Sequence, residues 1–469
     1  YKKHIYGIIN ISKTYLISKE VKPMYKAQSI ILNRSKHFYL CSIFDEWAKL
    51  AKETYNSALF IERQLVSSSK KSPSEYTDNE LEIRSYVQGK SFSTQKTIGY
   101  VKLERLIREH RTELYKNNLP NQSVQHILKS VVQDLKSYFQ AIKDYKNNPA
   151  KYTGKPKLTK YCKNDKKSFA ITNQDCVIYT RDNGTQYMKF PYITKKFGIF
   201  LELPYLPEEL SNNTKKLKEV HVIPYYDTYK LEIVYEAFES KKSGSNKVAA
   251  IDPGLDNLVT LVTEDESLVI NGKVIKSKNQ WYNKRAAELN RQLDKMYKTS
   301  KHPDSKQLTS LWKNRANWMN DYMHKVSRFI VDYCVIHDIG ILILGINPMW
   351  KQNCNMNKVN NQNFVQISHS KLYSLIQYKA QMAGITVIRQ EESYTSKASY
   401  VDNDDIPVYG KENGKPAFSG KRIKRGLYRA ADSTLINADV NGAANIGRKA
   451  LGISPFPVSA LQKVTSVTL

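Results

Sequence analysis

The stretch VAAIDPGLDNLVTLV, residues 248–262, decides the fold of the C-terminal half. An apolar run brings Asp252 to the end of an expected strand, and Pro253-Gly254 then turns the chain into a second apolar strand. An acid at the end of a central strand is costly unless it is solvated, paired or bound to a cation. Asp252 therefore either opens a turn or serves as a ligand.

A second acid lies in INADVNGAANIGRKAL, residues 436–451. Asp439 precedes a helix of small residues that can pack closely on a sheet, and it is either the N-terminal cap of that helix or a partner of Asp252. A strand-borne and a helix-borne Asp fit the carboxylate cage of a two-metal phosphodiesterase, in which two Mg²⁺ ions about 4 Å apart activate water and stabilise the leaving oxygen. Carboxylates are the hard oxygen ligands that Mg²⁺ prefers.

The sequence around these acids has an α/β pattern. Strands are predicted at 248–251, 258–262, 268–270, 341–344 and 385–390. Helices are predicted within 281–335, with an interruption near His302-Pro303, and at 368–383 and 440–451.

The first half has a different pattern. Apolar residues at helical spacing predict helices over 42–65, 81–112 and 121–145. Strands are then predicted at 168–172, 176–180, 187–189, 200–203, 220–224 and 229–234. We expect these strands to form an antiparallel, barrel-like region, completed by short strands in residues 5–35. The polar segment ESKKSGSNK, 239–247, marks the domain boundary.

The charge balance narrows the class of partner. The chain of 469 residues carries 73 Lys and Arg against 44 Asp and Glu, a net charge of +29, and 41% hydrophobic residues exclude disorder as its main state. Such a charge favours a polyanion over small metabolites, with nucleic acid as the first choice and an anionic membrane surface as the alternative. The 32 tyrosines, many beside Lys, are either stacking platforms for unpaired bases or a compositional bias.

Other features place the protein in a reducing cytoplasm. The longest apolar run, 340–346, is much shorter than the roughly 20 residues that span a bilayer, and the first residues do not resemble a signal peptide. Five cysteines, an odd number with no CxxC pair, argue against a disulfide framework and a zinc ribbon.

An ordered set of motifs resembles the RuvC-type nuclease of the transposon-encoded TnpB proteins. The motifs are DPGLDNL (252–258), DYMHKVSR (321–328), YTSK (394–397) and DVNGAANI (439–446). GKPKLTKY (154–161) is similar to the segment that enters the wedge domain of that family. The resemblance covers nearly the whole chain and is strongest from residue 248 onward.

The resemblance implies a multidomain α+β fold. Residues 1–35 and 150–247 would form a wedge β-barrel and the linker that follows it, with a helical recognition lobe inserted at 36–149, and 248–469 would form an RNase H-like, RuvC α/β nuclease domain. The implied activity is RNA-guided DNA cleavage with two Mg²⁺ ions, for which Mn²⁺ can substitute. The implied partners are a guide RNA and double-stranded target DNA, with no membrane and no small-molecule substrate, in a bacterial cytoplasm at the nucleoid.

The chain departs from the family at its third carboxylate. The family usually carries a Glu at the end of the fourth core strand, where ILILGIN (341–347) has Gly345. Some relatives, including the Fanzor proteins, have a relocated Glu two residues before the Tyr, which is Glu392 here. The neighbouring strand lies about 4.8 Å away, and alternation lets only one of the pair reach the site, so we expect Glu392 with Glu391 in reserve. Otherwise both are solvated acids and the site is inactive.

A second departure concerns the zinc ribbon that usually follows YTS in the family. Ala398 stands at the cysteine position, and the insert 398–435 contains no cysteine, so we expect no zinc. The insert contains a basic, Gly-rich stretch at 409–429. Either it is a solvated loop, or its basic side chains contact phosphates near the cut strand. The residues concerned are Lys421, Arg422, Lys424, Arg425 and Arg429.

The sequence thus predicts an RNA-guided DNA endonuclease that acts after guide pairing and recognition of a flanking motif. Asp252, Glu392 and Asp439 would hold the metals. One alternative, supported by Gly345, is a cleavage-deficient RNA-guided repressor. Another is a miniature type V CRISPR effector derived from TnpB. A structure-selective junction resolvase is a weaker alternative, since such enzymes need no recognition lobe or wedge of this size.

Overall fold

The computed structural model describes residues 24–87, 96–116, 119–204, 206–211, 213–237, 242–254, 256–300, 303, 305–346, 369–410 and 416–469. The chain divides into two compact units, Tyr1–Phe238 and Glu239–Leu469. The strands predicted before residue 24 lie outside the described residues, as do Leu255 of the DPGLDNL motif and His302.

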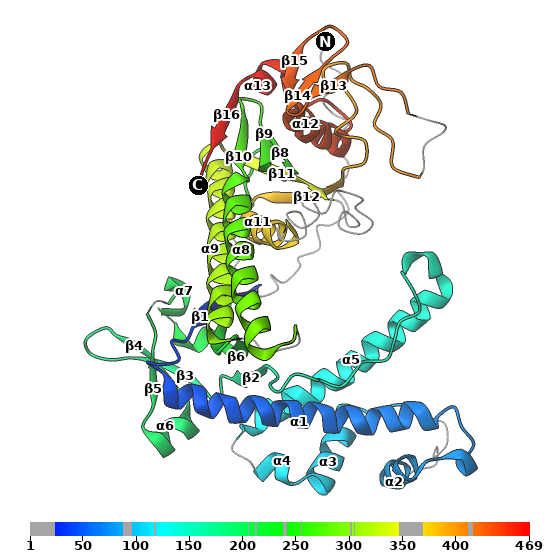
Figure 1. The fold of residues 1–469 in the computed structure, drawn as a ribbon, viewed down its shortest axis with the longest axis vertical. Helices are drawn as coiled ribbons and strands as arrows, with labels where there is room; N and C mark the ends of the chain where they lie inside the picture. The colour runs from blue at the N-terminus through cyan, green and yellow to red at the C-terminus, as the bar shows by residue number, and fades with distance from the viewer. Residues whose placement is uncertain are drawn as a thin grey trace. The chain divides into compact units, whose positions relative to one another are not determined.

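Helices make up one part of the first unit (Figure 1). They are α1 (Phe38–Ser68), α2 (Asp78–Tyr86), α3 (Tyr100–His110), α4 (Glu113–Lys116) and α5 (Asn121–Asn147). Helix α1 packs against α5, α2 and α3 through its buried apolar face. The helices predicted at 42–65 and 121–145 are confirmed. The helical pattern at 81–112 corresponds to α2 and α3, with 88–95 outside the described residues.

Two antiparallel sheets form the rest of this unit. The four-stranded sheet has the order β1 (Met24–Ile31), β7 (Thr228–Ala237), β6 (Leu217–Tyr225), β2 (Phe169–Thr172). The second sheet contains β3 (Val177–Thr180), β4 (Gln186–Lys189) and β5 (Phe200–Glu202), and α6 (Pro191–Phe197) and α7 (Glu208–Ser211) lie nearby in sequence. Strand β1 pairs with β7 along its whole length, which confirms an N-terminal contribution. Among the described strands β1 and β2 are sheet edges, so the closed barrel stays a prediction.

An aromatic cluster joins α1 to the four-stranded sheet and to the residue that precedes α6. The ring of Phe44 lies 6.0 Å from that of Trp47 on the same helix and 6.1 Å from Phe169 of β2, measured between centroids. It also lies 5.9 Å from Phe190, just before α6, and 5.5 Å from Tyr229 of β7. Edge-on aromatic pairs of this kind add to the stability gained from burial alone.

The second unit is built on a six-stranded sheet. Its order is β12 (Thr386–Glu391), β11 (Ile339–Ile346), β8 (Lys247–Pro253), β9 (Asn257–Val262), β10 (Ser267–Asn271), β16 (Val464–Val467). Strands β8, β9 and β10 are successively antiparallel, whereas β11 is parallel to β8 and β12 is parallel to β11. The five strands predicted for this half are confirmed. Strand β16 was not predicted.

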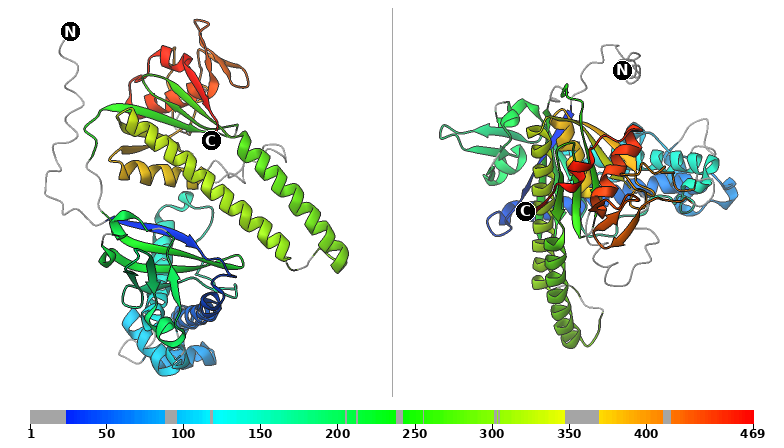
Figure 2. Two further views of the ribbon diagram at one scale, coloured as in Figure 1. Left: turned by 90° about the vertical axis from the view of Figure 1, so that its left-hand side faces the viewer. Right: turned by 90° about the horizontal axis from the view of Figure 1, so that it is seen from above.

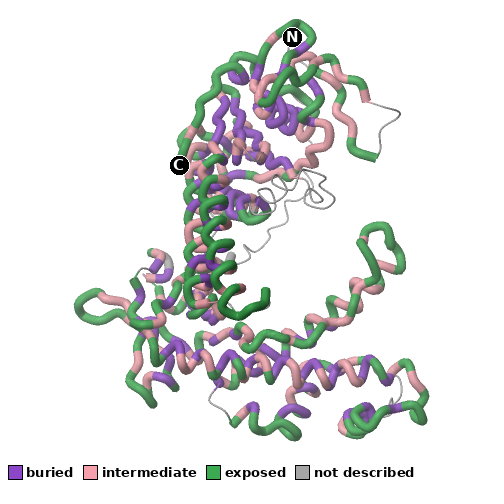
Figure 3. The backbone as a smooth tube through the Cα atoms, viewed as in Figure 1, coloured by how far each residue is buried: buried purple, intermediate pink, exposed green. Residues whose placement is uncertain are grey.

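Helices cover both faces of this sheet (Figure 2). Alternate residues of β8 point to opposite faces: Ala249 and Ile251 pack with α9 (Lys306–Ile336) and α11 (His369–Met382), whereas Ala250 packs with α12 (Ala438–Leu451). Helix α8 (Lys273–Tyr297) packs along α9. Strands β8 and β11 and helix α12 are largely buried (Figure 3).

A small three-stranded sheet lies next to α12 in the sequence. It consists of β13 (Lys421–Lys424), β14 (Leu427–Arg429) and β15 (Leu435–Asn437), and α13 (Val458–Gln462) contacts β15. The basic stretch at 409–429 therefore contains a β-hairpin over 421–429, while 411–415 lie outside the described residues. In the part of the chain that the structure describes, no helix is long and apolar enough to cross a bilayer.

Candidate active site

Asp252 lies near the end of β8, opposite Thr260 of β9. The pKa of its carboxyl is raised well above the ordinary value by desolvation and by the negative charges of Glu392 and Asp439. Glu392 and Asp439 therefore both lie close enough to Asp252 to repel its carboxylate when ionised. The alternative that Asp252 merely opens a turn does not account for this repulsion.

Asp439 lies in the first turn of α12. The N-cap of this helix is Asn437, whose side-chain oxygen accepts hydrogen bonds from the backbone N–H groups of Asp439 at 2.9 Å and Val440 at 3.3 Å. The alternative that Asp439 itself caps the helix is therefore wrong. Its carboxylate instead accepts a hydrogen bond of 2.6 Å from Asn257 Nδ2.

Two glycines make room for these acids. A Cβ atom on Gly442 would lie 2.6 Å from Asp252 Oδ2, so α12 approaches β8 this closely only without a side chain there. A Cβ atom on Gly345 would lie 3.2 Å from Glu392 Oε2 and 2.5 Å from Ile446 Cδ1. The carboxylate of Glu392 therefore lies beside position 345, where the family usually carries its Glu.

Glu391 and Glu392 have different surroundings. Desolvation and the charge of Glu391 raise the pKa of Glu392 to about 7. The carboxylate of Glu391 accepts hydrogen bonds of 2.8 Å from Lys449 Nζ and 2.6 Å from the backbone N–H of Ser393. Desolvation acts to raise the pKa of Glu391, but these hydrogen bonds hold it below its ordinary value. Glu391 is thus engaged elsewhere, and Glu392 is the member of the pair that faces the other acids.

The three acids line one cavity of about 280 Å³. The other lining residues are Pro253, Gly254, Asn257, Thr260, Thr395 and Ser396. Within the described ranges, no group of three or more His, Cys, Asp or Glu is arranged so that it could hold a metal ion as it stands. The donor chemistry nonetheless suits a hard cation, because three carboxylates line the cavity and two of them raise the pKa of the third.

The basic hairpin reaches the acids beside the cavity. Arg422 Nη2 lies 3.4 Å from Asp439 Oδ1, and Arg425 forms an ion pair with Asp256. Asp256 is also paired with Lys276. The other predicted phosphate contacts of the hairpin are exposed: Lys421, Lys424 and Arg429. The hairpin therefore presents positive charge next to the acidic cavity.

Sequence reasoning missed several residues of the site. Asn257, Thr395 and Ser396 all lie in motifs that were quoted for the resemblance, so the motifs contained the signal. Tyr373 of α11 has a buried hydroxyl for which the described residues offer no hydrogen-bond partner. Its pKa is raised by desolvation and by the charges of Glu392 and Asp252. No sequence signal indicated Tyr373, because α11 and the acids meet only in the folded chain.

The matches to known families fall mostly in the second unit, Glu239–Leu469. Residues 229–349 match the OrfB_IS605 family, described as a probable transposase, and residues 369–446 match the family described as Cas12f1-like, TNB domain. The TnpB-like protein ORF457 of Acidianus two-tailed virus is 25% identical over 225 residues. That match spans 46% of this chain and 45% of the relative, less than half of either protein. These matches confirm the resemblance to TnpB proteins.

The solved structures that match this chain include a Cas12f1 complex and a CRISPR-Cas_phi3 endonuclease. The structure titled as a Cas12f1–sgRNA–target DNA complex has a TM-score of 0.33 and 15% identity, and the match covers 92% of this chain and 100% of that chain. The structure of the mini-RNA-guided endonuclease CRISPR-Cas_phi3 has a TM-score of 0.43 and 11% identity, over 94% of this chain and 95% of that one. At these scores the likeness is distant.

Proposed function

We propose that the protein is an RNA-guided, Mg²⁺-dependent DNA endonuclease of the RuvC type. The observation that carries the proposal is the convergence of Asp252, Glu392 and Asp439 on one cavity. They come from the end of β8, the residue after β12 and the first turn of α12. Three elements bring these carboxylates together, and Glu392 and Asp439 raise the pKa of Asp252 although Arg422 partly offsets them. Such a cluster is typical of a cation site.

The sheet supports an RNase H-like catalytic domain. Three antiparallel strands, β8 to β10, are followed by two strands parallel to β8, in the spatial order β10-β9-β8-β11-β12. Asp252 lies near the end of β8, in the middle of this array. Glu392 directly follows β12, the strand at its edge. Such an arrangement is the one expected for a RuvC-type nuclease.

The side chains of the cavity have distinct roles in this proposal. When bound, two Mg²⁺ ions would activate water and stabilise the leaving oxygen of the phosphodiester. Asp252, Glu392 and Asp439 would hold the ions. Asn257 orients the Asp439 carboxylate through its hydrogen bond, and the glycines at 345 and 442 keep the space that the carboxylates need.

The partners in this proposal are a guide RNA and double-stranded target DNA. Base pairing with the guide would supply most of the sequence specificity, while the protein would read a flanking motif and the heteroduplex shape. The net charge of +29 supports binding to two polyanions. The wedge with its linker (1–35 and 150–247) and the recognition lobe (36–149) would lie almost wholly in the first unit, which ends at Phe238. Residues 248–469 would supply the nuclease, and the protein would act in a bacterial cytoplasm at the nucleoid.

A second candidate is an RNA-guided DNA binder that does not cut, and Gly345 is the observation that favours it. The position of the Glu392 carboxylate beside Gly345 argues for cutting. A miniature type V CRISPR effector would use the same chemistry, and the DNA flanking the gene distinguishes it from a transposon protein.

The test is cleavage of a plasmid that carries a guide-matched target beside a randomised flank. The purified protein–RNA complex is compared with Glu392→Gln and with the matched control Glu391→Gln, in Mg²⁺ or Mn²⁺. We expect Glu392→Gln to lose about 100-fold or more in rate, because it removes a charge that holds the cations. Glu391→Gln should retain most of the activity, since Glu391 pairs with Lys449.

Two other outcomes would change the proposal. Binding of the target without cleavage by the unmodified protein would favour the repressor. Equal loss in the two variants would show that the two acids act together, contrary to their separate surroundings.

A further inference from the structure

Helix α12 carries two buried asparagines, Asn441 and Asn445, that are not among the candidate metal ligands. They lie one turn apart, so their side chains project from one face of the helix. Burying an amide is costly unless it forms hydrogen bonds, so the partners of these two side chains indicate what they hold in place.

Both amides hold the segment that follows β12. Asn445 Nδ2 donates to the backbone carbonyl oxygens of Thr395 at 2.9 Å and Ala398 at 2.7 Å. Asn441 Nδ2 donates to the carbonyl oxygen of Ala398 at 2.8 Å, and its Oδ1 accepts from the backbone N–H of Tyr400 at 3.0 Å. The two asparagines therefore share one partner and differ in the other.

The contacts of Asn445 fix which end of its amide faces this segment. A carbonyl oxygen only accepts, so two carbonyl oxygens at these distances require the NH₂ group on that side. The other atom, Oδ1, is buried and has no partner among the described residues. A buried acceptor in this state lowers stability. An apolar side chain would fill the space without that cost, so the contribution of Asn445 is its two donated hydrogen bonds.

The turn that Asn445 holds begins at Glu392. The backbone N–H of Thr395 donates to the carbonyl oxygen of Glu392 at 3.3 Å, and the Thr395 hydroxyl donates to the same oxygen at 2.8 Å. Thr395 is buried, and both it and Ser396 line the cavity of the three acids. Thr395 therefore connects Asn445 of α12 to the backbone of Glu392.

The same helix lies against the other two acids of the cavity. Asp439 lies in its first turn, and a Cβ atom on Gly442 would lie 2.6 Å from Asp252 Oδ2. Asn445 lies three residues after Gly442, on the same side of the helix. One helix therefore places Asp439 and bounds the position of Asp252. Through Asn445 it also holds the turn that begins at Glu392.

We propose that Asn445 is a positioning residue that keeps Glu392 in register with Asp439 for cation binding. Metal sites depend on groups behind the ligands that fix their orientation, and loss of such a group typically lowers metal affinity about 10–100-fold. The proposal rests on the proposed function, because it assigns Asn445 to the site formed by the three acids. Asn441 holds the segment farther along the chain from Glu392 and shapes that segment alone.

The experiment compares Asn445→Leu with the matched control Asn441→Leu. Leucine has the same branched arrangement of side-chain heavy atoms as asparagine and lacks the polar atoms. The first variant removes a donor from Thr395, the second removes an acceptor from Tyr400, and each leaves one hydrogen bond to Ala398. Thermal melts in EDTA should show a similar loss of stability in both. If either variant does not fold, the two alanine variants give the same comparison without added bulk.

Mn²⁺ binding is the first quantity measured. Full-length protein freed of nucleic acid is titrated with Mn²⁺, and the free ion is followed by its EPR signal. The part of the binding that Glu392→Gln weakens belongs to the three acids. We expect Asn445→Leu to weaken it about tenfold and Asn441→Leu about twofold or less. Adding Asn445→Leu to Glu392→Gln should cause no further loss, because the positioned ligand is already absent.

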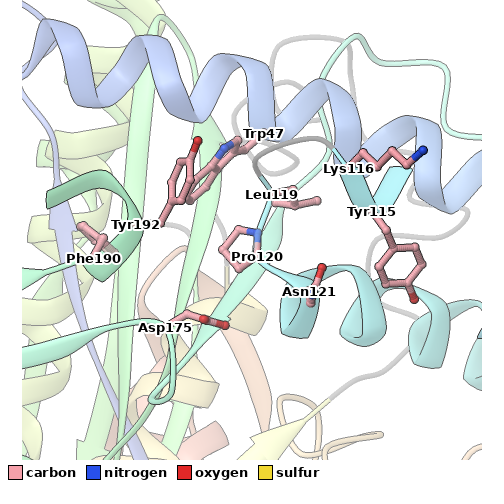
Figure 4. A pocket seen from close by; sticks show the side chains of 9 residues that line it. All are labelled: Trp47, Tyr115, Lys116, Leu119, Pro120, Asn121, Asp175, Phe190 and Tyr192. Atoms are coloured by element: carbon pink, nitrogen blue, oxygen red, sulfur yellow. The ribbon is translucent and has the colours of Figure 1, made fainter. Parts of the chain in front are cut away.

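A cavity of about 330 Å³ in the first unit does not complicate this titration. Its lining includes Lys116 and Asp175 (Figure 4). Among the described residues that line it, Asp175 is the one acid, and Lys116 adds positive charge. Mn²⁺ prefers several oxygen ligands such as carboxylates, so this cavity is no comparable cation site. Changes in the α12 variants therefore report on the three acids.

Cleavage gives a second readout that loss of stability does not mimic. Asn445→Leu displaces a ligand without removing it, so raising the Mg²⁺ concentration should bring its cleavage rate back toward that of the unmodified protein. Glu392→Gln lacks the carboxylate itself and should respond much less.

Equal weakening of Mn²⁺ binding in Asn445→Leu and Asn441→Leu would overturn the proposal, since the loss would then follow stability. A further loss in the double variant would also overturn it, because Asn445 would then act on another group. In both cases the proposed function stands. If Glu392→Gln leaves Mn²⁺ binding unchanged, the three acids do not hold the cation, and the proposed function fails together with this inference.

Discussion

Two aspartates, Asp45 in the first unit and Asp252 in the second, differ in the groups that surround a partly desolvated carboxylate. Asp45 of α1 accepts hydrogen bonds from three neighbours: Arg34, Lys166 and Tyr229. Desolvation acts to raise the pKa of Asp45, but these hydrogen bonds hold it below its ordinary value. Desolvation also raises the pKa of Asp252, and there the neighbours that matter most are two further acids, Glu392 and Asp439, which raise it further.

The difference separates a structural carboxylate from a candidate ligand. The chain supplies the positive charge and donors for Asp45, so that carboxylate joins α1 to β7 and needs nothing else. At the wall of a cavity, the described chain offsets the charge of Asp252 only in part, through Arg422. A charged group kept in such a place costs stability, and a bound cation would remove that cost.

Asp252→Asn should have the largest effect on activity and the opposite effect on stability. We expect cleavage to fall about 100-fold or more, because one of the three carboxylates that hold the cations is lost. We also expect the thermal midpoint in EDTA to rise, because the variant removes like-charge repulsion. Cleavage assays and thermal melts check the two parts.

Mg²⁺ provides the control for this prediction. It should raise the thermal midpoint of the unmodified protein, since a ligand that binds only the folded state stabilises it, and it should raise that of Asp252→Asn much less. An equal rise in both proteins would show that the cation binds elsewhere. Asp252 would then no longer differ from Asp45 as a candidate ligand.

Asp45→Asn should show the reverse pattern. Removing one partner leaves Arg34 and Lys166 without their carboxylate, and we expect a loss of about 2–3 kcal/mol in unfolding free energy, reduced from the fully buried case because these groups are partly exposed. Mg²⁺-dependent cleavage per folded molecule should stay unchanged. Denaturant melts of the full chain give the first quantity. A rise in stability would show that the cluster is strained.

Much of the fold was predictable from sequence because the elements have clear periodicities. The run that carries Asp252 is apolar on both sides, as expected for a central strand, and it forms β8 between β11 and β9. The face that α1 buries follows helical spacing. The edge strand β16 was missed because its residues are mostly exposed and lack an apolar pattern. Its parallel pairing with β10 comes from tertiary structure.

The site was predictable in part. Alternation indicated that only one of Glu391 and Glu392 faces the other acids, and the contacts of Lys449 with Glu391 decide between them. The pairing of Lys449 with Glu391 joins α12 to β12, and no local pattern indicates it. The assignment of Asp439 as a possible cap failed because the helix begins at Ala438, two residues earlier than predicted, with Asn437 as its cap.

A third buried acid tests whether a raised pKa alone marks a site. Glu62 of α1 is fully buried, and desolvation raises its pKa to about 8. One carboxylate oxygen accepts a hydrogen bond of 3.3 Å from the backbone N–H of Ile98, and the other has no partner among the residues that the structure describes. Unlike Asp252, Glu62 has no acidic neighbour among the causes of its shift. We therefore expect Glu62 to be a neutral core residue that binds no cation.

Glu62→Gln should change the pH dependence of stability and little else. Because the folded state holds the proton more tightly than the unfolded state, Glu62 costs nothing below the unfolded pKa, near 4.5, and progressively destabilises the fold as the pH rises toward 8. Glutamine removes that cost. The free energy of unfolding of the variant should therefore equal that of the unmodified protein at pH 4.5 and exceed it by about 1–2 kcal/mol near pH 8. This gain is smaller than the full pKa shift implies, because water that enters the site relaxes it. Melts across this range measure the difference, with Glu53→Gln, an exposed acid of the same helix, as the control. A Mg²⁺-dependent stabilisation that disappears in Glu62→Gln would give Glu62 the role assigned to Asp252, and a raised pKa would then mark a cation site without any cluster of acids.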